Sequence, residues 1–358
     1  MPIALDLHSH IPHPAGPLRL RVDSAALADN WRWLAAQSGQ AQCGAAVKAN
    51  AYGLGARDAV RVLVDAGCRI FFVATWAEAI ELAPWHEELE LHVLHGVRDE
   101  DMPTALAYNA RPVLNSVEQV RRWRQGGKGR PCSVMVDTGM NRLGVSVAEL
   151  GAGLLDGLNC DLVISHLASA DEDVPLNARQ RADFAALMPQ LSGRRMSIAN
   201  SAGITLGRDY HFDLTRPGLS LYGGIARREA EGHIRPVARI EAQVLQRRRI
   251  AAGDTVGYNA TFAADRPMEL AILNLGYADG YWRGFSGKGR ALRDGVELPV
   301  IGRVSMDLTA VAVDAAPGIK EGDWVEVDYT LATAAKLSGM SQYELLTGLG
   351  RRFERHWA

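Results

Sequence analysis

Short apolar runs alternate with helical segments between residues 17 and 230, and this alternation constrains the fold more than any other feature. The segments between the runs repeat apolar residues at helical spacing, as in the stretch that starts at Ser24, a residue suited to capping a helix. The apolar runs lie at 44–47, 70–74, 91–94, 112–114, 134–136, 162–165, 196–199 and 219–222. Strands that alternate with helices in this way predict an α/β fold, a parallel (β/α)8 barrel of the TIM type.

Polar residues follow the predicted strands directly. Lys48, Asp137, His166 and Ser201 each come just after one of the apolar runs. The active site of a (β/α)8 barrel lies at the carboxyl ends of its strands. We therefore expect these side chains at the functional end of the barrel.

The pattern changes after about residue 232. Segments rich in Val, Ile and Leu, separated by turn residues, lie at 238–245, 268–274, 297–301, 309–313 and 324–327. A short helical stretch at 341–349 follows them. The sequence predicts an N-terminal tail at 1–16, the barrel at 17–231 and a mostly β C-terminal domain at 232–358.

Composition excludes several classes of partner. The formal net charge is −2 over 358 residues, and no long block of like charge is present, so neither nucleic acid nor a charged membrane surface is indicated as a partner. No apolar run is long enough to span a bilayer, and the N-terminus lacks the features of an export signal. The cysteines are widely spaced, which favours reduced thiols and a cytoplasmic location.

Lys48 is the strongest single candidate for chemistry. It ends an apolar, strand-like run and precedes a polar turn broken by Gly53 and Gly55. A lysine is expensive to bury and loses its charge readily when desolvated, so a lysine at a strand end is a candidate Schiff-base amine.

The segment VKANAYGLG around Lys48 closely resembles the cofactor-lysine motif of the alanine racemase family, a fold-type III family that depends on pyridoxal 5'-phosphate. Further segments resemble the family in the same order, at 136–144, 165–171, 199–203, 215–219, 256–262, 275–281 and 301–307. The resemblance implies an isomerase that interconverts L-alanine and D-alanine, a precursor of peptidoglycan. It also implies a homodimer with shared active sites and a small amino acid as the substrate.

The resemblance assigns a role to each matching residue. Lys48 would hold pyridoxal phosphate and act as one base, and Tyr258 from the partner subunit would act on the opposite face of the substrate. Arg142 and the Met306 amide would bind the substrate carboxylate. The implied cofactor contacts are Tyr52, His166, Ser201, Arg216, Gly218 and Leu219, and the implied entrance residues are Tyr277, Arg283 and Arg303. No metal ion is expected.

Two departures from the family pattern stand out. Many family members carry a carbamylated lysine seven residues before the arginine of the substrate motif, and this chain has Met135 there. Arg142 must therefore find another anion or remain less tightly held. The family tyrosine that narrows the pocket aligns near Arg351 in this chain, which leaves selectivity for alanine open.

Two alternatives compete with this interpretation. A racemase of broader specificity, acting on serine, lysine or other amino acids, would use the same motifs. A barrel metal-dependent amidohydrolase would instead begin with His8 and His10, and His95, His166 and His211 could complete its metal site. Peptidoglycan supply and D-alanine catabolism would both use the same racemase chemistry.

Overall fold

The computed structural model describes residues 15–82, 89–151 and 153–358. It divides into two compact units. The barrel unit comprises Val22–Ala238, Thr330–Gly348 and Trp357–Ala358, and the β unit comprises the described residues up to Arg21 together with Arg239–Tyr329 and Leu349–His356. None of the described helices combines the length and the apolar character needed to cross a bilayer.

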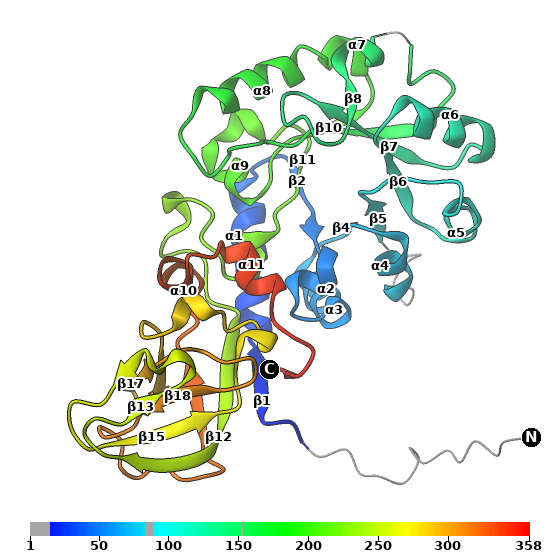
Figure 1. Cartoon of the computed structure of the whole chain (residues 1–358). Coiled ribbons are helices and arrows are strands. Elements are labelled where there is room, and N and C mark those ends of the chain that lie inside the picture. The colour runs from blue at the N-terminus through cyan, green and yellow to red at the C-terminus, as the bar shows by residue number, and fades with distance from the viewer. Residues whose placement is uncertain (1–14, 83–88, 152) are drawn as a thin grey trace, which may run out of the picture. The chain divides into compact units, whose positions relative to one another are not determined.

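The barrel unit is a ring of parallel strands with helices between them (Figure 1). Its strands are β2 (Gln42–Cys43), β3 (Ala45–Ala46), β4 (Ile70–Val73), β5 (Glu90–Val93), β6 (Arg111–Leu114), β7 (Cys132–Asp137), β9 (Cys160–Ile164), β10 (Arg195–Ser197) and β11 (Leu214–Thr215). The strands pair in the order β10-β9-β7-β6-β5-β4-β3, and β11 pairs with β2. Asp213, directly before β11, donates its backbone amide to Met196 O at 3.0 Å, and Thr215 O in β11 accepts from Gly44 N at 2.9 Å. These bonds to both sides close the ring.

Most connections between these strands are helical. They are α1 (Ser24–Gln37), α2 (Lys48–Tyr52), α3 (Ala56–Ala66), α4 (Trp76–Glu81), α5 (Met102–Ala107), α6 (Val117–Gly126), α8 (Pro175–Ala185) and α9 (Ser201–Leu206), with the small β8 (Val145–Ser146) and α7 (Val147–Leu150) after β7. The unit also includes α10 (Leu331–Ser338) and α11 (Gln342–Thr347). The predicted (β/α)8 class is confirmed.

Two local predictions in the barrel unit are wrong. The run 219–222, predicted to be the eighth strand, forms a buried 3-10 helix, and the strand is β11, which ends before Pro217. A short apolar run cannot be distinguished from a buried helical turn by its periodicity alone. Asp23 rather than Ser24 caps α1, because its carboxylate accepts a hydrogen bond from Ala26 N at 2.7 Å.

The β unit is an antiparallel barrel. Its strands are β1 (Leu18–Val22), β12 (Ala238–Ile250), β13 (Thr255–Val256), β14 (Phe262–Ala263), β15 (Met268–Leu273), β16 (Arg290–Arg293), β17 (Val296–Ile301), β18 (Thr309–Ala312), β19 (Trp324–Val327) and β20 (Glu354–Trp357). The long strand β12 pairs with β19 through one half and with β15 through the other, with a bulge between Val244 and Gln246. This double pairing closes the ring β15-β18-β17-β16-β19-β12. Relative to the expected domain limits, β1 belongs to this sheet, whereas α10 and α11 belong to the barrel unit.

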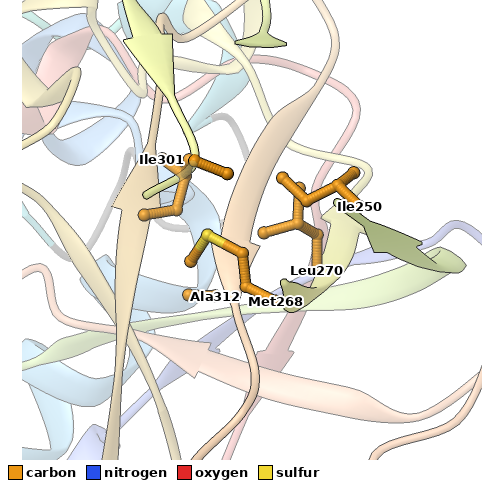
Figure 2. Close-up of a cluster of buried hydrophobic side chains, with 6 residues drawn as sticks. Ile250, Met268, Leu270, Ile301 and Ala312 are labelled. Atoms are coloured by element: carbon orange, nitrogen blue, oxygen red, sulfur yellow. The ribbon is translucent and has the colours of Figure 1, made fainter. Parts of the chain in front are cut away.

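An apolar cluster supports one end of the β unit (Figure 2). It contains Ile250, Ala264, Met268, Leu270, Ile301 and Ala312. Val256 and Phe262 pack against the cluster, and they pair with each other as the last and first residues of β13 and β14. The cluster therefore anchors both ends of the loop 257–261, which carries Tyr258.

Candidate active site

A cavity of about 660 Å³ opens among residues at the carboxyl ends of the barrel strands. Lys48 follows β3, His166 follows β9, Ser201 follows β10 and Arg216 follows β11, and all of them line the cavity. Arg142, from the loop after β7, lines it as well. A volume of this size is typical of a site for a small organic ligand. The residues that follow the strands therefore converge on one cavity, as predicted.

The turn after Lys48 is left-handed although it contains no glycine before Gly53. Ala49, Asn50, Ala51 and Tyr52 all have φ between 52° and 54°. Such a conformation costs an L-residue about 1–2 kcal/mol. Hydrogen bonds hold the turn at both ends, from Ala51 N to Val47 O at 2.8 Å and from Gly53 N to Ala49 O at 2.9 Å. Strain of this kind persists only where the surroundings fix it, and it concentrates at functional sites.

The amine of Lys48 lies in a largely cationic cavity. Burial lowers the pKa of Lys48, and the positive charges of Arg142 and Arg216 lower it further, while Glu78 raises it. A lysine whose pKa is lowered has a larger neutral fraction, which is the form that attacks a carbonyl or accepts a proton. The amine is therefore suited to nucleophilic and base chemistry.

Arg216 is buried and lines the cavity. Its guanidinium donates to the hydroxyl of Ser197 and, at 2.7 Å, to the backbone oxygen of Ser165. Burial lowers the pKa of Arg216 to about 9, so the side chain stays charged at neutral pH. The site thus contains a fixed donor that keeps its proton.

The family resemblance implies that His166 orients Arg216, but among the described residues no hydrogen bond joins the two side chains. Ser197 and the backbone of Ser165 hold the guanidinium instead. Burial, followed by the charges of Arg216 and Arg142, lowers the pKa of His166 to about 3. His166 is therefore neutral over the physiological range and adds no charge to the cavity.

One wall of the cavity is lined by hydroxyl and backbone amide groups. The hydroxyl of Ser201 accepts hydrogen bonds from Gly218 N at 2.9 Å and from Ser220 N at 3.2 Å. A Cβ on Gly218 would lie 2.2 Å from the hydroxyl of Tyr52, so only glycine leaves this hydroxyl its place. Tyr52 and Leu219 also line the cavity. Hydroxyls and amides of this kind suit the oxygens of a phosphate group.

Arg142 lies on an exposed loop, and Met135 lines the cavity before it. Within the described residues Arg142 forms no ion pair, so no carboxylate of this unit takes the place of the missing carbamylated lysine. Asp137, the nearest acidic residue in sequence, accepts hydrogen bonds from Gly139 N and Met140 N, both at 2.8 Å. Arg142 therefore remains available for an acidic ligand.

The remaining predicted site residues belong to the β unit. The side chains of Tyr258 and Met306 are 63% and 54% exposed. Arg283 lies over the ring of Tyr277, 5.1 Å from its centroid. Arg303 is exposed and lines a second cavity, of about 510 Å³, beside Gly257.

Three further residues take part in the site, although no sequence pattern indicated them. Glu78 lines the cavity and contacts the turn after Lys48, and Ser197 holds Arg216. Tyr343, from α11, also lines the cavity, with its ring centroid 6.3 Å from that of Tyr52. Arg351 was expected near the position of the pocket-narrowing tyrosine, but it is exposed and does not line the cavity. Tyr343 supplies the aromatic ring instead.

The metal-dependent alternative gains no support from the described residues. His8 and His10 lie outside them. His211 is buried and hydrogen-bonded to Ile204 O at 2.8 Å, whereas His95 and His166 line the cavity. No group of three or more His, Cys, Asp or Glu side chains in the described part of the chain is arranged to hold a metal ion.

Family models match nearly the whole chain. Residues 22–226 match the model described as the alanine racemase N-terminal domain, and residues 237–357 match that of the alanine racemase C-terminal domain. The chain is 42% identical to a biosynthetic alanine racemase of Agrobacterium fabrum over 366 residues, with 95% of this chain and 94% of the relative covered. It is 41% identical to a catabolic alanine racemase of the same organism over 354 residues, with 94% and 91% covered.

Among solved structures, the fold is similar to that of an alanine racemase from Bartonella henselae, which carries covalently bound pyridoxal phosphate. The TM-score is 0.89 at 36% sequence identity, and the match covers 96% of this chain and 100% of the other.

Proposed function

The chain belongs to the alanine racemase family, and we propose that it interconverts L-alanine and D-alanine with pyridoxal 5'-phosphate and two opposed bases. The observation that carries this proposal is the cavity at the strand ends, where a lysine of lowered pKa lies among Arg142, Arg216 and Ser201. The amine can attack a carbonyl carbon, and the other groups can donate hydrogen bonds to carboxylate and phosphate oxygens.

The residues present fit the cofactor. Lys48 would hold it, Arg216 would donate to its ring nitrogen, and the Ser201 hydroxyl, the Tyr52 hydroxyl and the Leu219 amide would hold its phosphate. When bound, pyridoxal phosphate serves as an electron sink for the carbanion left when an amino acid loses its α-proton. Because Arg216 keeps its own proton, it would leave the ring nitrogen unprotonated, which would weaken that sink and favour racemisation over transamination.

Racemisation requires a proton to leave one face of the substrate and return to the other, so Lys48 needs an opposed partner. We assign this role to Tyr258 of a second copy of the chain. Tyr258 belongs to the β unit, and its exposed ring leaves the hydroxyl accessible to another subunit. In a C2 homodimer each chain would supply one lysine site and one tyrosine, which gives two identical active sites.

Tyr343 supports alanine as the substrate. Its ring lies beside Tyr52 in the cavity wall, so an aromatic side chain limits the space available to the substrate. Arg142, unpaired among the described residues, would bind the substrate carboxylate together with the Met306 amide of the partner. Tyr277, Arg283 and Arg303 would line the entrance.

We place the reaction in the cytoplasm, where either peptidoglycan supply or D-alanine catabolism would use it. The four cysteines are unpaired and three of them are buried, as suits a reducing compartment. Because a biosynthetic and a catabolic relative are about equally similar, sequence identity does not decide between these roles.

Mixing two inactive variants tests the shared site. Lys48→Ala chains lack the attachment lysine, and Tyr258→Phe chains should lose about 10² to 10⁴ in rate. After subunit exchange, a hybrid dimer contains one site with both wild-type residues, so activity should recover to about a quarter of wild type. Lys48→Ala mixed with the double variant is the control, because that pair cannot form a wild-type site.

The outcomes separate the parts of the proposal. Hybrid dimers without recovered activity would mean that both bases come from one chain. Borohydride reduction of the loaded wild type should fix a phosphopyridoxyl group on Lys48 and not on the exposed Lys128. An adduct elsewhere would overturn the role of Lys48, and racemisation of serine or lysine at the rate of alanine would overturn the substrate assignment.

A further inference from the structure

Glu78 joins the ends of two neighbouring barrel strands. It lies in the first turn of α4, where Thr75 Oγ1 accepts a hydrogen bond from its backbone amide at 3.2 Å. Its carboxylate turns back and accepts one hydrogen bond from Ala49 N at 2.8 Å and another from Ala74 N at 2.7 Å. Ala49 follows Lys48, and Ala74 follows β4. Both carboxylate oxygens are therefore committed to the backbone at the site.

The contact to Ala49 fixes the start of the left-handed turn. Ala49 is the first of the residues with positive φ, and its amide donates to Glu78 rather than to another group of the turn. The side chain of the next residue, Asn50, links the turn to the start of α3, because its Oδ1 accepts from Ala56 N at 2.8 Å. The two side-chain contacts hold a strained segment whose position determines that of Lys48.

Glu78 also balances charge at the amine. The charged groups that act on Lys48 come from three elements: Arg142 after β7, Arg216 after β11 and Glu78 on α4. The other titratable groups lining the cavity are Tyr52, His95, Asp137, His166 and Tyr343. Asp137 directs its carboxylate to the amides of its own loop, so Glu78 is the acidic side chain that offsets the two arginines.

We propose that Glu78 is the positioning residue for Lys48, fixing the amide that follows the lysine and favouring the ammonium form when Lys48 holds a proton. This inference deepens the proposed function and rests on it. Lys48 must alternate between a neutral base and a charged acid, because the proton it takes from one enantiomer is returned when the other reacts. A fixed carboxylate beside two arginines keeps the charged form accessible.

Three variants separate the charge of Glu78 from its contacts. Glu78→Gln keeps the length of the side chain but removes the charge, and it leaves one acceptor oxygen in place of the two that bind Ala49 N and Ala74 N. Glu78→Asp keeps the charge but is too short to reach both amides. Glu81→Gln is the matched control, since Glu81 lies on the same helix with an exposed side chain.

The measurement is the pH dependence of acetylation of Lys48 by acetic anhydride in the full-length chain stripped of cofactor, followed by mass spectrometry. The exposed residues Lys128, Lys288, Lys320 and Lys336 serve as references in the same digest. Thermal unfolding shows whether each variant is folded, and kcat/KM is measured on the reloaded protein.

We expect the midpoint for Lys48 to move to lower pH in Glu78→Gln and to stay at the wild-type value in Glu81→Gln. Glu78→Asp should keep a midpoint near wild type but lose at least about tenfold in kcat/KM, since a small misplacement of a reacting group can cost about 10²-fold. An unchanged midpoint in folded Glu78→Gln overturns the proposal. If that variant does not fold, wild-type kcat/KM in Glu78→Asp overturns it.

These results are independent of the test of the proposed function. If the proposed function is wrong, the wild-type protein itself will show no racemisation or will carry the phosphopyridoxyl adduct on another lysine. A failure of the present inference appears only in the Glu78 variants, as an unchanged Lys48 midpoint in folded Glu78→Gln or, if that variant does not fold, as wild-type kcat/KM in Glu78→Asp.

Discussion

Replacing Gly218 with alanine tests the wall of hydroxyls and amides. The added Cβ would lie 2.2 Å from the hydroxyl oxygen of Tyr52 and 2.9 Å from its Cζ, closer than non-bonded atoms approach. Tyr52 has little freedom to withdraw, because it is 6% exposed and its ring stacks on Tyr222 at 4.8 Å. The variant must therefore either hold the strain or move the tyrosine away from the phosphate site.

Each response has a predictable magnitude. Strain held in the folded chain is overpacking, which costs about 1–3 kcal/mol of unfolding free energy. A displaced Tyr52 no longer donates to the phosphate, and a hydrogen bond to a charged group contributes about 1.5–3 kcal/mol, or roughly 10- to 100-fold in the Kd for pyridoxal phosphate. Urea unfolding of the stripped chain measures the first cost, and absorbance titration with the cofactor measures the second.

Gly318→Ala is the control, because a Cβ there meets no atom within 4 Å and the backbone needs no positive φ. In a Tyr52→Phe background, Gly218→Ala should cost less, since the nearest clashing atom is absent. The reasoning is refuted if Gly218→Ala leaves both the unfolding free energy and the Kd at wild-type values, or if its cost is the same in both backgrounds.

Two further predictions concern Arg216 and His166, which line the cavity. Ser197→Ala removes an acceptor from the buried guanidinium of Arg216 and should lower kcat/KM by about 10- to 100-fold. Ser165→Ala is the control and should have little effect on this contact, because Ser165 binds Arg216 through its backbone oxygen. Equal losses of kcat/KM in the two variants would contradict the assignment. His166 has a pKa of about 3 when folded and about 6.5 when unfolded, so the unfolded chain binds more protons between these values, and stability should be lost as pH falls from about 6.5 towards about 3. Urea unfolding of His166→Gln across that range should show a shallower loss than the wild type, and an identical slope would exclude His166 as its source.

The strand ends were predictable because the signals for them are local. A buried parallel strand produces an apolar run, and the residue after it is placed at the mouth of the barrel by the fold itself. Lys48, His166 and Ser201 could therefore be placed from the chain alone. The same local rule failed at 219–222, where Pro217 ends the strand and the apolar residues are buried as a helical turn instead.

Other members of the site carry no local signal. Tyr343 follows the β unit in sequence, yet it belongs to the barrel unit. Ser197 is a small polar residue at the end of the short strand β10, and its side-chain partner depends on which strand lies next to it. Assignments of this kind require the three-dimensional pairing of elements, which periodicity does not provide.

The turn after Lys48 shows why local sequence patterns do not predict such contacts. Ala49, Asn50 and Ala51 are ordinary residues for a right-handed helix, and Ala49 and Ala51 gain nothing from a positive φ. The compensating contact comes from Glu78, 29 residues further along the chain, through its hydrogen bond to Ala49 N. A conformation that its own residues disfavour is therefore maintained by a group on the next β/α connection. Because that group also carries a negative charge, the contact that sets the position of the lysine also influences its protonation.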